Sequence, residues 1–469
     1  YVVEEKAGQN CVLDPEAKEF EIAYKGQEVA VDYVTMELTN QRQKVSLSLL
    51  KKDAETGKPL EGVVFGLYAQ EDIKNAAGEV VVEKDALIEL GTTDEEGKLV
   101  FQADLPHGKY YIQEVEHKPG YLPNDEVCSF DASYTDQTLE LLAFSEEISN
   151  QPTITEFTKV DLTGGQEIEG AKMQILDQEG KVVEEWVSKK EAHVVYALAP
   201  GEYILHEEQA PTEQGYVRAE DVKFVVEETG DVQKVKMEDD HTKVSISKTD
   251  ITDGKEIEGA KLQILDQDGE VVESWTTGEE HLIEYLPVGT YTLHEEAAVD
   301  GYIVANDVEF TVEETGEIQK VKMEDERAMG QLVIVKTDTD SKAALEGVEF
   351  VLLEKETGKE VGRLKTGKDG KAVSELLPIG TYENGVFKEP ITYVLKETAT
   401  LKGYEKTEEE WEIVFTYQND KTPVIEVVKE IQNKKIPETP GTVKPGPKTG
   451  DDTNWFLPLL ALGVSAGMV

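Results

Sequence analysis

The sequence YTLHEEAAVDGY, residues 291–302, has the pattern of a β-strand that runs into a tight turn. Tyr291, Leu293 and Glu295 occupy alternate positions, so the Glu295 carboxyl group shares the apolar face of the strand. Burial of a carboxyl group is costly unless the group is partnered, and it favours the neutral, protonated form. The stretch therefore predicts a buried acid that needs a polar partner from elsewhere in the chain.

The same pattern, a glutamate on the apolar face of a strand before a turn, recurs along the chain. Its copies are YYIQEVEHKPGY from Tyr110, YILHEEQAPTEQGY from Tyr203 and YVLKETATLKGY from Tyr393. The chain itself starts inside another copy, YVVEEKAGQNCVLDP. The inward glutamates are Glu4, Glu114, Glu207, Glu295 and Glu397. Self-similarity of this kind indicates tandem modules, each with one buried acid.

The composition describes an acidic chain without a disulfide framework. The 469 residues include 97 Asp and Glu against 47 Lys and Arg, a formal net charge of -50. That charge disfavours binding to nucleic acid or to anionic membrane surfaces. The two cysteines, Cys11 and Cys128, fall in different modules, so no disulfide is expected. Because the sequence begins with Tyr1 in the middle of a module, we expect a fragment of a longer protein, and the missing signal peptide is uninformative.

Short runs with period-two alternation, separated by D-G and E-G turns, predict all-β modules. The clearest repeat is QEIEGAKMQILDQEGKVVEEW from Gln166, which matches KEIEGAKLQILDQDGEVVESW from Lys255. The predicted boundaries are 1–43 for the end of a truncated module, 44–151, 152–241, 242–327 and 328–435 for complete modules, and 436–469 for a Pro-rich linker with an apolar end. The complete modules are called one to four below, in chain order.

Each complete module carries two further polar residues on apolar strand faces. A lysine lies on the first strand, and an asparagine or aspartate lies on the last. The sets are Lys51, Glu114 and Asn150; Lys159, Glu207 and Asp239; Lys248, Glu295 and Asp325; and Lys336, Glu397 and Asn433, with Glu4 and Asn40 in the truncated module. In modules two and three a second acid follows, Asp240 or Glu326, so the register could be shifted by one residue.

Two interpretations fit these sets. One is a buried ion-pair network, which is costly because apolar residues in its place would often stabilise the fold. The other is covalent: a buried lysine that loses its proton becomes a nucleophile, and a protonated glutamate polarises the carbonyl group of the Asn or Asp. The product is a side-chain amide, formed with loss of ammonia or water. The reaction needs no cofactor and turns over once, so the chain is not an enzyme in the usual sense. The fourfold repetition favours this second interpretation.

The E-x-x-A-P-x-G-Y-like box, the K-x-D near each module start and the L-P-x-G-x-Y segment resemble the collagen-adhesin B-type, SpaA-like prealbumin modules of Gram-positive surface proteins and pilins. The resemblance covers nearly all of the chain to residue 435. It implies an elongated array of Greek-key, immunoglobulin-like β-sandwiches. It also implies that isopeptide bonds join the lysine of each set to its Asn or Asp, with the strand glutamates as catalysts.

The C-terminal region changes character. The segment IPETPGTVKPGPKTGDDTN is proline-rich and has the composition of a linker. The 15 residues after it carry no charge. A run of this length is shorter than the roughly 20 residues needed to span a bilayer. The linker contains a segment that resembles a cell-wall sorting signal, made up of Pro447, Lys448, Thr449 and Gly450. Gly446 stands where leucine is usual, and the alternative is a chance PKTG in a linker. The resemblance implies that a sortase cuts after the threonine and joins it to peptidoglycan.

We expect an extracellular, wall-anchored structural protein, either a stalk or a pilin subunit. Its expected partners are sortase and peptidoglycan, with other pilin subunits or host extracellular matrix as further candidates. One alternative is an adhesin that binds a host ligand through an exposed apolar patch on its modules. Another is the wall stalk of an enzyme whose catalytic domain lies upstream of residue 1.

No cofactor or metal site is expected from the sequence. His206 and His294 point away from the inward glutamates on their strands, and no third ligand is evident, so both are expected at the surface. The D-Q-D-G run from Asp266 lies between two predicted strands and lacks the later glutamate of a calcium loop. It is therefore expected to be a hairpin turn.

Overall fold

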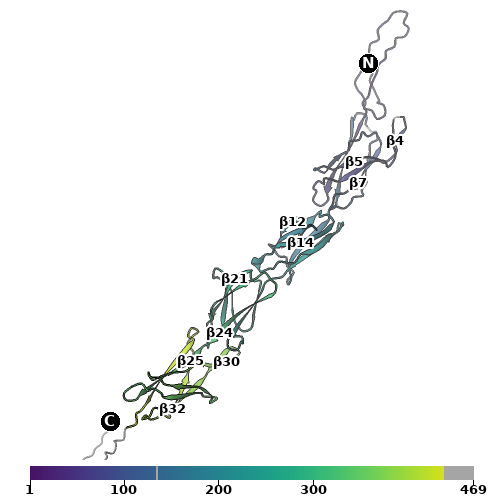
Figure 1. Cartoon of the computed structure of the whole chain (residues 1–469). Helices are drawn as coiled ribbons and strands as arrows, with labels where there is room; N and C mark the ends of the chain where they lie inside the picture. The colour runs from purple at the N-terminus through teal and green to yellow at the C-terminus, as the bar shows by residue number, and fades with distance from the viewer. Residues whose placement is uncertain (76, 134–135, 438–469) are drawn as a thin grey trace, which may run out of the picture.

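The computed structural model describes residues 1–437 except 76 and 134–135, and from residue 44 onward these residues form an elongated row of β-sandwiches (Figure 1). The modules follow one another along the row in chain order (Figure 1). The only helix in the described ranges is the short 3-10 helix η1 (Thr212–Gln214). No helix in this part of the chain is long and apolar enough to cross a membrane. The expected all-β fold of tandem sandwiches is confirmed.

Modules one and two are built from short strands with alternating burial. The strands of module one are β1 (Lys44–Asp53), β2 (Val64–Ala69), β3 (Ile73–Lys74), β4 (Val80–Val82), β5 (Leu87–Thr92), β6 (Lys98–Val100), β7 (Lys109–Glu116), β8 (Cys128–Asp131) and β9 (Leu141–Asn150). Those of module two are β10 (Ile154–Asp161), β11 (Lys172–Leu176), β12 (Val182–Val187), β13 (His193–Tyr196), β14 (Gly201–Gln209), β15 (Val222–Val226) and β16 (Val232–Asp239). In β1 every second side chain from Val45 to Asp53 is buried, as a period-two sequence requires.

Modules three and four repeat this order of strands. The strands of module three are β17 (Lys243–Asp250), β18 (Lys261–Leu265), β19 (Val271–Thr276), β20 (His281–Glu284), β21 (Gly289–Ala297), β22 (Tyr302–Ile303), β23 (Val308–Val312) and β24 (Ile318–Arg327). Those of module four are β25 (Met329–Asp338), β26 (Glu349–Glu354), β27 (Glu360–Lys365), β28 (Lys371–Val373), β29 (Leu377–Pro378), β30 (Gly380–Glu383), β31 (Val386–Pro390), β32 (Thr392–Ala399), β33 (Glu410–Val414) and β34 (Val424–Asn433).

Every complete module has two main sheets that enclose its own core. One sheet pairs the first strand with the last in parallel, as β1 with β9 and β25 with β34. The other places the glutamate-bearing strand between two neighbours, in the order β5-β2-β7-β8 in module one. In module one the core between the sheets contains Leu47, Phe65 and Ile112, each at most 1% exposed. The lysine and the Asn or Asp of a set therefore lie on one sheet, and the glutamate faces them from the other.

The register of the parallel pair brings the lysine close to the Asn or Asp. Lys51 pairs with Ile148 and Asp53 pairs with Asn150, so Asn150 lies opposite the residue two positions after the lysine. The same offset holds for β10 with β16, β17 with β24 and β25 with β34. Because residues two apart on a strand share a face, the lysine and the Asn or Asp both point into the core.

Residues 1–43 contain isolated bridges instead of extended strands. Val2 bridges Lys18, and Cys11 bridges Arg42. Several large apolar side chains of this segment face solvent, including Tyr24 at 80% and Tyr33 at 83% exposure. The thiols of both cysteines of the chain are free.

Adjacent modules dock at the glycine of the Gly-Tyr turn. Gly120 has φ +89°, and a Cβ atom there would lie 2.2 Å from the carbonyl oxygen of Ala197 in module two. At the next joint, a Cβ on Gly215 would lie 2.4 Å from the backbone of Tyr285. Both the left-handed conformation and the close approach require glycine at these turns.

The joint between modules three and four has an additional element, the β30–β31 hairpin. Tyr382 on this hairpin donates a hydrogen bond to the carbonyl oxygen of Gly301, at 2.8 Å. The hairpin tip at Gly385 packs so closely on module three that a Cβ there would lie 2.2 Å from the carbonyl oxygen of Glu256. The hairpin therefore braces this joint from one side.

Candidate cross-linking site

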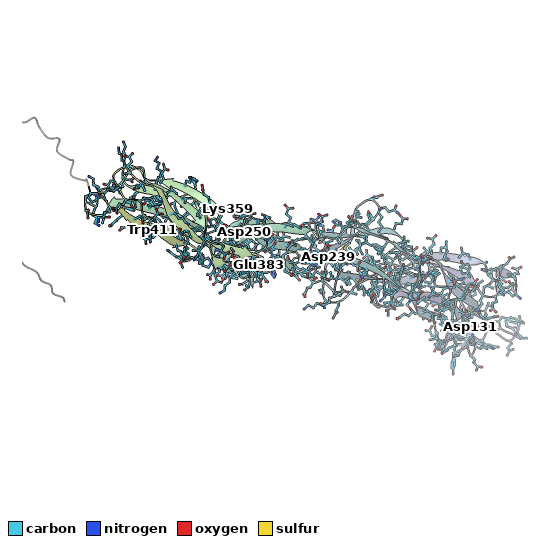
Figure 2. All side chains as sticks on the ribbon, turned by 90° about the horizontal axis from the view of Figure 1, so that it is seen from below. Asp131, Asp239, Asp250, Lys359, Glu383 and Trp411 are labelled. Atoms are coloured by element: carbon cyan, nitrogen blue, oxygen red, sulfur yellow. The ribbon has the colours of Figure 1, made fainter. Side chains whose placement is uncertain are left out.

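The four predicted sets each come together as a compact, buried cluster. In every module the lysine Nζ lies 2.9 Å from Oε2 of the glutamate, and the side chains of both residues are at most 4% exposed. The same Nζ also contacts Oδ1 of the Asn or Asp on the neighbouring strand. These contacts are too well buried to be ion pairs at exposed strand ends. Figure 2 shows side chains along the row of modules, with Asp239 of module two labelled.

In modules one and four the partner is an asparagine whose amide group is held at both ends. Asn150 turns its Oδ1 to Lys51 and donates from Nδ2 to both oxygens of Glu114, at 2.9 and 3.0 Å. Asn433 likewise donates from Nδ2 to Oε1 of Glu397, at 2.6 Å. The amide nitrogen that would leave thus contacts the carboxyl group that would supply its proton.

Burial lowers the pKa of the lysines in these two modules. Lys51 and Lys336 both have a pKa below the usual lysine value because desolvation disfavours the charged amine, although Glu114 and Glu397 oppose the shift. A lower pKa increases the fraction of neutral amine, which is the nucleophilic form.

In modules two and three the partner is an aspartate, and two carboxyl groups face each other. Burial raises the pKa of Asp239 to about 7, with Lys159 opposing the shift and Glu207 adding to it. Asp325 has the same shift, to about 7, from burial, with Lys248 opposing it and Glu295 adding to it.

The unpaired oxygens of these clusters are consistent with a shared proton. Oε1 of Glu207 and Oδ2 of Asp239 are both buried without a hydrogen-bond donor, as are the same two atoms of Glu295 and Asp325. One proton between the two carboxyl groups would satisfy both oxygens, because two buried carboxylates side by side disfavour double ionisation.

The structure also shows which of the two consecutive acids in modules two and three meets the lysine. Asp239 and Asp325 are fully buried beside their lysines. Asp240 instead lies near the surface and accepts a hydrogen bond from Nζ of Lys243 at 2.6 Å, and Glu326 is exposed. The lysine amines therefore meet the first acid of each pair.

Sequence reasoning missed a second contact, between the aspartate of K-x-D and the tyrosine of the Gly-Tyr turn. Tyr121 donates from its hydroxyl group to Oδ2 of Asp53 at 2.9 Å, and Tyr302 donates to Oδ2 of Asp250 at 2.8 Å. Each of these aspartates lies two residues after the lysine of its set, so the contact fixes the end of the strand that carries this lysine. The recurrence of K-x-D and Gly-Tyr in every complete module was the available signal.

The truncated module brings its two predicted groups, Glu4 and Asn40, together. Asn40 donates from Nδ2 to Oε2 of Glu4 at 2.6 Å, and this contact is exposed. Glu4 also accepts a hydrogen bond from the backbone of Asp14 at 2.9 Å.

The remaining predicted features are surface features or lie outside the described residues. His206 and His294 contact Asp221 and Asp307, each at 2.7 Å, and the described residues contain no cluster of metal ligands. The Asp266 run forms the turn between β18 and β19. The sorting-signal residues Pro447, Lys448, Thr449 and Gly450 lie outside the part of the chain that the structure describes.

Among solved structures, the chain is similar to the Bacillus anthracis TIE protein, with 22% identity over 84% of this chain and 73% of that one, at a TM-score of 0.43. It is also similar to a streptococcal ancillary pilin, with 16% identity over 61% of this chain and 99% of that one, at a TM-score of 0.26. BcpA, the major pilin subunit of Bacillus cereus, has 16% identity over 61% of this chain and 100% of that one, at a TM-score of 0.26. A comparison with curated proteins finds no match.

A family model described as a prealbumin-like fold domain, SpaA, matches the chain in four successive segments. The segments are 45–144, 153–241, 242–327 and 330–390. Together they cover well over half of the chain, and each falls on one of the sandwiches that hold a lysine, a glutamate and an Asn or Asp. The chain therefore belongs to the SpaA prealbumin-like fold domain family.

Proposed function

We propose that modules one to four are self-cross-linking β-sandwiches and that the chain is a mechanical stalk or pilin-type shaft of a bacterial cell surface. One observation carries the proposal. In all four modules a buried lysine amine lies 2.9 Å from a buried glutamate and contacts the side-chain oxygen of an Asn or Asp on the adjacent strand. The proposed boundaries at 151, 241 and 327 would separate units that each hold one such set.

The proposed reaction forms one amide bond in each module. The neutral lysine Nζ attacks Cγ of the Asn or Asp, and a C–N bond forms. The glutamate accepts a proton from the attacking amine and delivers one to the leaving group. In modules one and four the C–N bond to Nδ2 breaks and ammonia leaves, and in modules two and three a C–O bond breaks and water leaves. The glutamate ends in its starting protonation state, so no cofactor or other reactant is consumed.

The covalent interpretation accounts for the repetition better than an ion-pair network does. A buried ion pair carries a desolvation cost that apolar residues would avoid. An amide bond removes both charges, and it also closes a loop of 77 to 99 residues between the joined side chains. Retention of the same three groups in four modules is expected if their product is a permanent bond.

The intact mass of the folded chain, measured after denaturation, should be lower than the mass calculated from the sequence by two molecules of ammonia and two of water. Modules one and four each lose ammonia, because their acceptors are Asn150 and Asn433, and modules two and three each lose water. A matched control replaces all four lysines of the sets with methionine and should have its full calculated mass. The full calculated mass for the unchanged chain would refute the proposal.

Raising the pH above 7 should speed cross-linking in modules one and four more than in modules two and three. The aspartates of modules two and three have a pKa raised to about 7, and the aspartate must be protonated for water to leave. Because the pKa is about 7, the protonated form of the aspartate decreases about tenfold for each pH unit above 7, and this loss offsets the gain in neutral lysine amine. In modules one and four a higher pH instead increases the neutral fraction of Lys51 and Lys336.

The measurement is a time course of bond formation in each module on either side of pH 7, read from the masses of module-specific proteolytic peptides. Faster bond formation at the higher pH that is confined to modules one and four agrees with the prediction. An equal pH dependence in all four modules would contradict the assignment of the titrating groups.

The proposed setting is extracellular, with the chain attached to peptidoglycan by a sortase at Thr449 and with other pilin subunits as neighbours in a shaft. The support for this part is the PKTG motif and the charge-free run after it. The elongated row of modules fits a protein that spans distance from a surface (Figure 1).

A further inference from the structure

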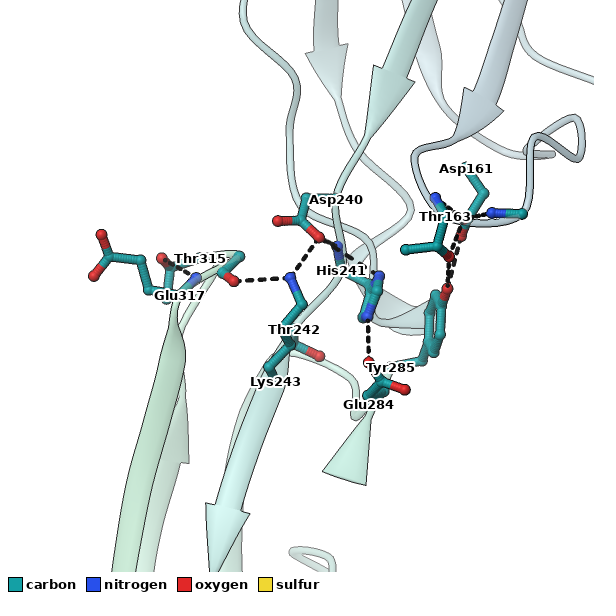
Figure 3. A network of polar contacts seen from close by, with 12 residues as sticks. Asp161, Thr163, Asp240, His241, Thr242, Lys243, Glu284, Tyr285, Thr315 and Glu317 are labelled. Carbon is teal, nitrogen blue, oxygen red and sulfur yellow. Dashed lines mark hydrogen bonds and ion pairs between the residues drawn. The ribbon is translucent and has the colours of Figure 1, made fainter. Parts of the chain in front are cut away.

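The joint between modules two and three brings a side chain of module three into contact with the strand that carries the module-two lysine. Tyr285 follows β20 of module three, and its hydroxyl group donates to Oδ2 of Asp161 in module two at 2.8 Å (Figure 3). The same hydroxyl group lies 3.1 Å from Oγ1 of Thr163. A residue of one module thus completes the hydrogen bonding of a buried carboxylate in the module before it.

Asp161 is placed to control the geometry of the module-two cluster. It lies two residues after Lys159 on β10, and its register partner on β16 is Asp239. Its Oδ1 atom accepts backbone hydrogen bonds from Thr163 and Gly164, both at 2.7 Å. Burial opposes ionisation of Asp161, but these donors and Tyr285 hold its pKa below the usual value. The carboxylate therefore ties the end of the lysine-bearing strand to the turn after it.

Modules one and three obtain this contact from a tyrosine of the same module, whereas in module two a tyrosine of module three donates to Oδ2 of the aspartate. In modules one and three the tyrosines of the Gly-Tyr turns, Tyr121 and Tyr302, donate to Asp53 and Asp250. The corresponding tyrosine of module two, Tyr216, also interacts with Asp161: burial, the charge of that carboxylate and a side-chain hydrogen bond to it raise the pKa of Tyr216 to about 12. The hydrogen bond to Oδ2 of Asp161 nevertheless comes from Tyr285.

The joint between modules one and two provides an internal comparison. Ala197 and Tyr285 both contact the glycine of the preceding Gly-Tyr turn, and both have left-handed backbone conformations, with φ of +60° and +61°. This conformation is unfavourable for a residue with a side chain, and it recurs at the corresponding position of both joints. Ala197 has no hydroxyl group, and module one instead relies on its own Tyr121.

The ring of Tyr285 is held in place from two sides. The ring of His241 stacks on it with centroids 3.9 Å apart and an angle of 16° between planes, and His241 is only 1% exposed. Tyr216 packs edge-on with centroids 5.6 Å apart. Nε2 of His241 lies 3.2 Å from Oε1 of Glu284, the residue before Tyr285 (Figure 3). The hydroxyl group therefore has a fixed direction toward Asp161 once the modules dock.

We propose that Tyr285 is a positioning residue for the Lys159–Asp239 cross-link, so that module two forms its bond rapidly only after module three has docked. The inference rests on the proposed cross-linking function. Without the hydroxyl group one oxygen of a buried carboxylate loses its donor, and the end of β10 is less firmly held. Bond formation depends on close alignment of Nζ with Cγ, so a loosened strand slows it. The chain would then cross-link module two in response to correct assembly of the joint.

The test is a time course of bond formation in the full chain, sampled during cell-free synthesis and read from module-specific peptide masses. Tyr285→Phe should slow the module-two bond about tenfold, the factor expected for one lost hydrogen bond to a charged group. The bonds in modules one, three and four should form at unchanged rates. Normal bond formation in module three shows that the variant has folded.

Three further variants separate positioning from a general effect on the joint. Replacement of Tyr285 with 4-aminophenylalanine retains a donor in the same place and should restore the rate. In an Asp161→Asn background, Tyr285→Phe should have little additional effect, because the group it acts through is altered. Tyr216→Phe is the matched control at the same joint and should slow the bond less.

The outcomes distinguish the two proposals. An unchanged module-two rate in Tyr285→Phe, with all four bonds forming, would overturn this inference and leave the cross-linking function in place. Equal slowing in modules two and three would also overturn it, because the effect would then be on folding in general. Absence of all four bonds in the unchanged chain would overturn the proposed function itself.

Discussion

Glu295→Gln is expected to leave Lys248 and Asp325 unjoined and to lower the melting temperature of module three by roughly 20 °C. The glutamine introduced by this substitution could still accept the backbone hydrogen bond that Ala305 donates to Oε2 of Glu295 at 2.7 Å, so the local packing is preserved. It could not supply a carboxyl proton to the leaving water, so the reaction would stop before the amide forms.

The size of this effect follows from the loop that the bond closes. Lys248 and Asp325 are 77 residues apart in sequence. By the loop-entropy model for covalent cross-links, a bond across such a loop stabilises a module by about 4–5 kcal/mol. In a domain of this size each kcal/mol shifts the melting temperature by about 4–8 °C. The variant also retains a buried lysine and aspartate, which adds a desolvation cost that the amide would remove.

The measurement combines intact mass with differential scanning calorimetry of the full chain. Glu295→Gln should regain the mass of one water, after allowing for the substitution, and one calorimetric transition should move to lower temperature. Glu296→Gln changes the exposed neighbour on the same strand and should alter neither quantity. Retention of the module-three bond in Glu295→Gln would show that Glu295 is not its catalyst.

Period-two alternation was sufficient to predict the strands and the inward face of each polar residue. Glu295 and Lys248 were identified because each interrupts an apolar face, and a buried charge of this kind is unusual. The pattern does not reveal which strands are neighbours, because pairing depends on contacts such as that between Lys51 and Asn150, which are 99 residues apart. The sequence therefore predicted which groups would be buried, and the coordinates show that they meet.

The joints could not be predicted from the sequence for a related reason. Ala197 and Tyr285 occupy corresponding places, yet only the tyrosine reaches the preceding module with a hydrogen bond. Nothing in the local sequence distinguishes a side chain that packs in the core of its own module from one that contacts the neighbouring module. The same holds for the β30–β31 hairpin, whose role as a brace depends on the position of Gly301 in the module before it.

The parallel pairing of first and last strands determines how a module carries tension. Force on module four enters at the start of β25 and leaves at the end of β34, and these two strands are neighbours. The proposed bond between Lys336 and Asn433 would transfer the load from one strand to the other near the point of exit. Only the segment from Met329 to Lys336 would then lie on the load path, and the residues between Lys336 and Asn433 would carry none of it.

Lys336→Met is therefore expected to make module four extensible under force, in a chain whose other modules stay locked. The unchanged chain should show no unfolding step from module four, because the covalent path cannot lengthen. In the variant the 97 residues between positions 336 and 433 are released on unfolding. At about 3.3–3.6 Å for each residue, they should add roughly 300 Å of contour length in one step. Single-molecule force spectroscopy of the full chain measures this step directly.

Lys355→Met removes an exposed lysine of the same module and should produce no such step, because Lys355 pairs only with a surface glutamate, Glu412. A step of roughly 300 Å in the unchanged chain would mean that module four carries its load without a covalent bond.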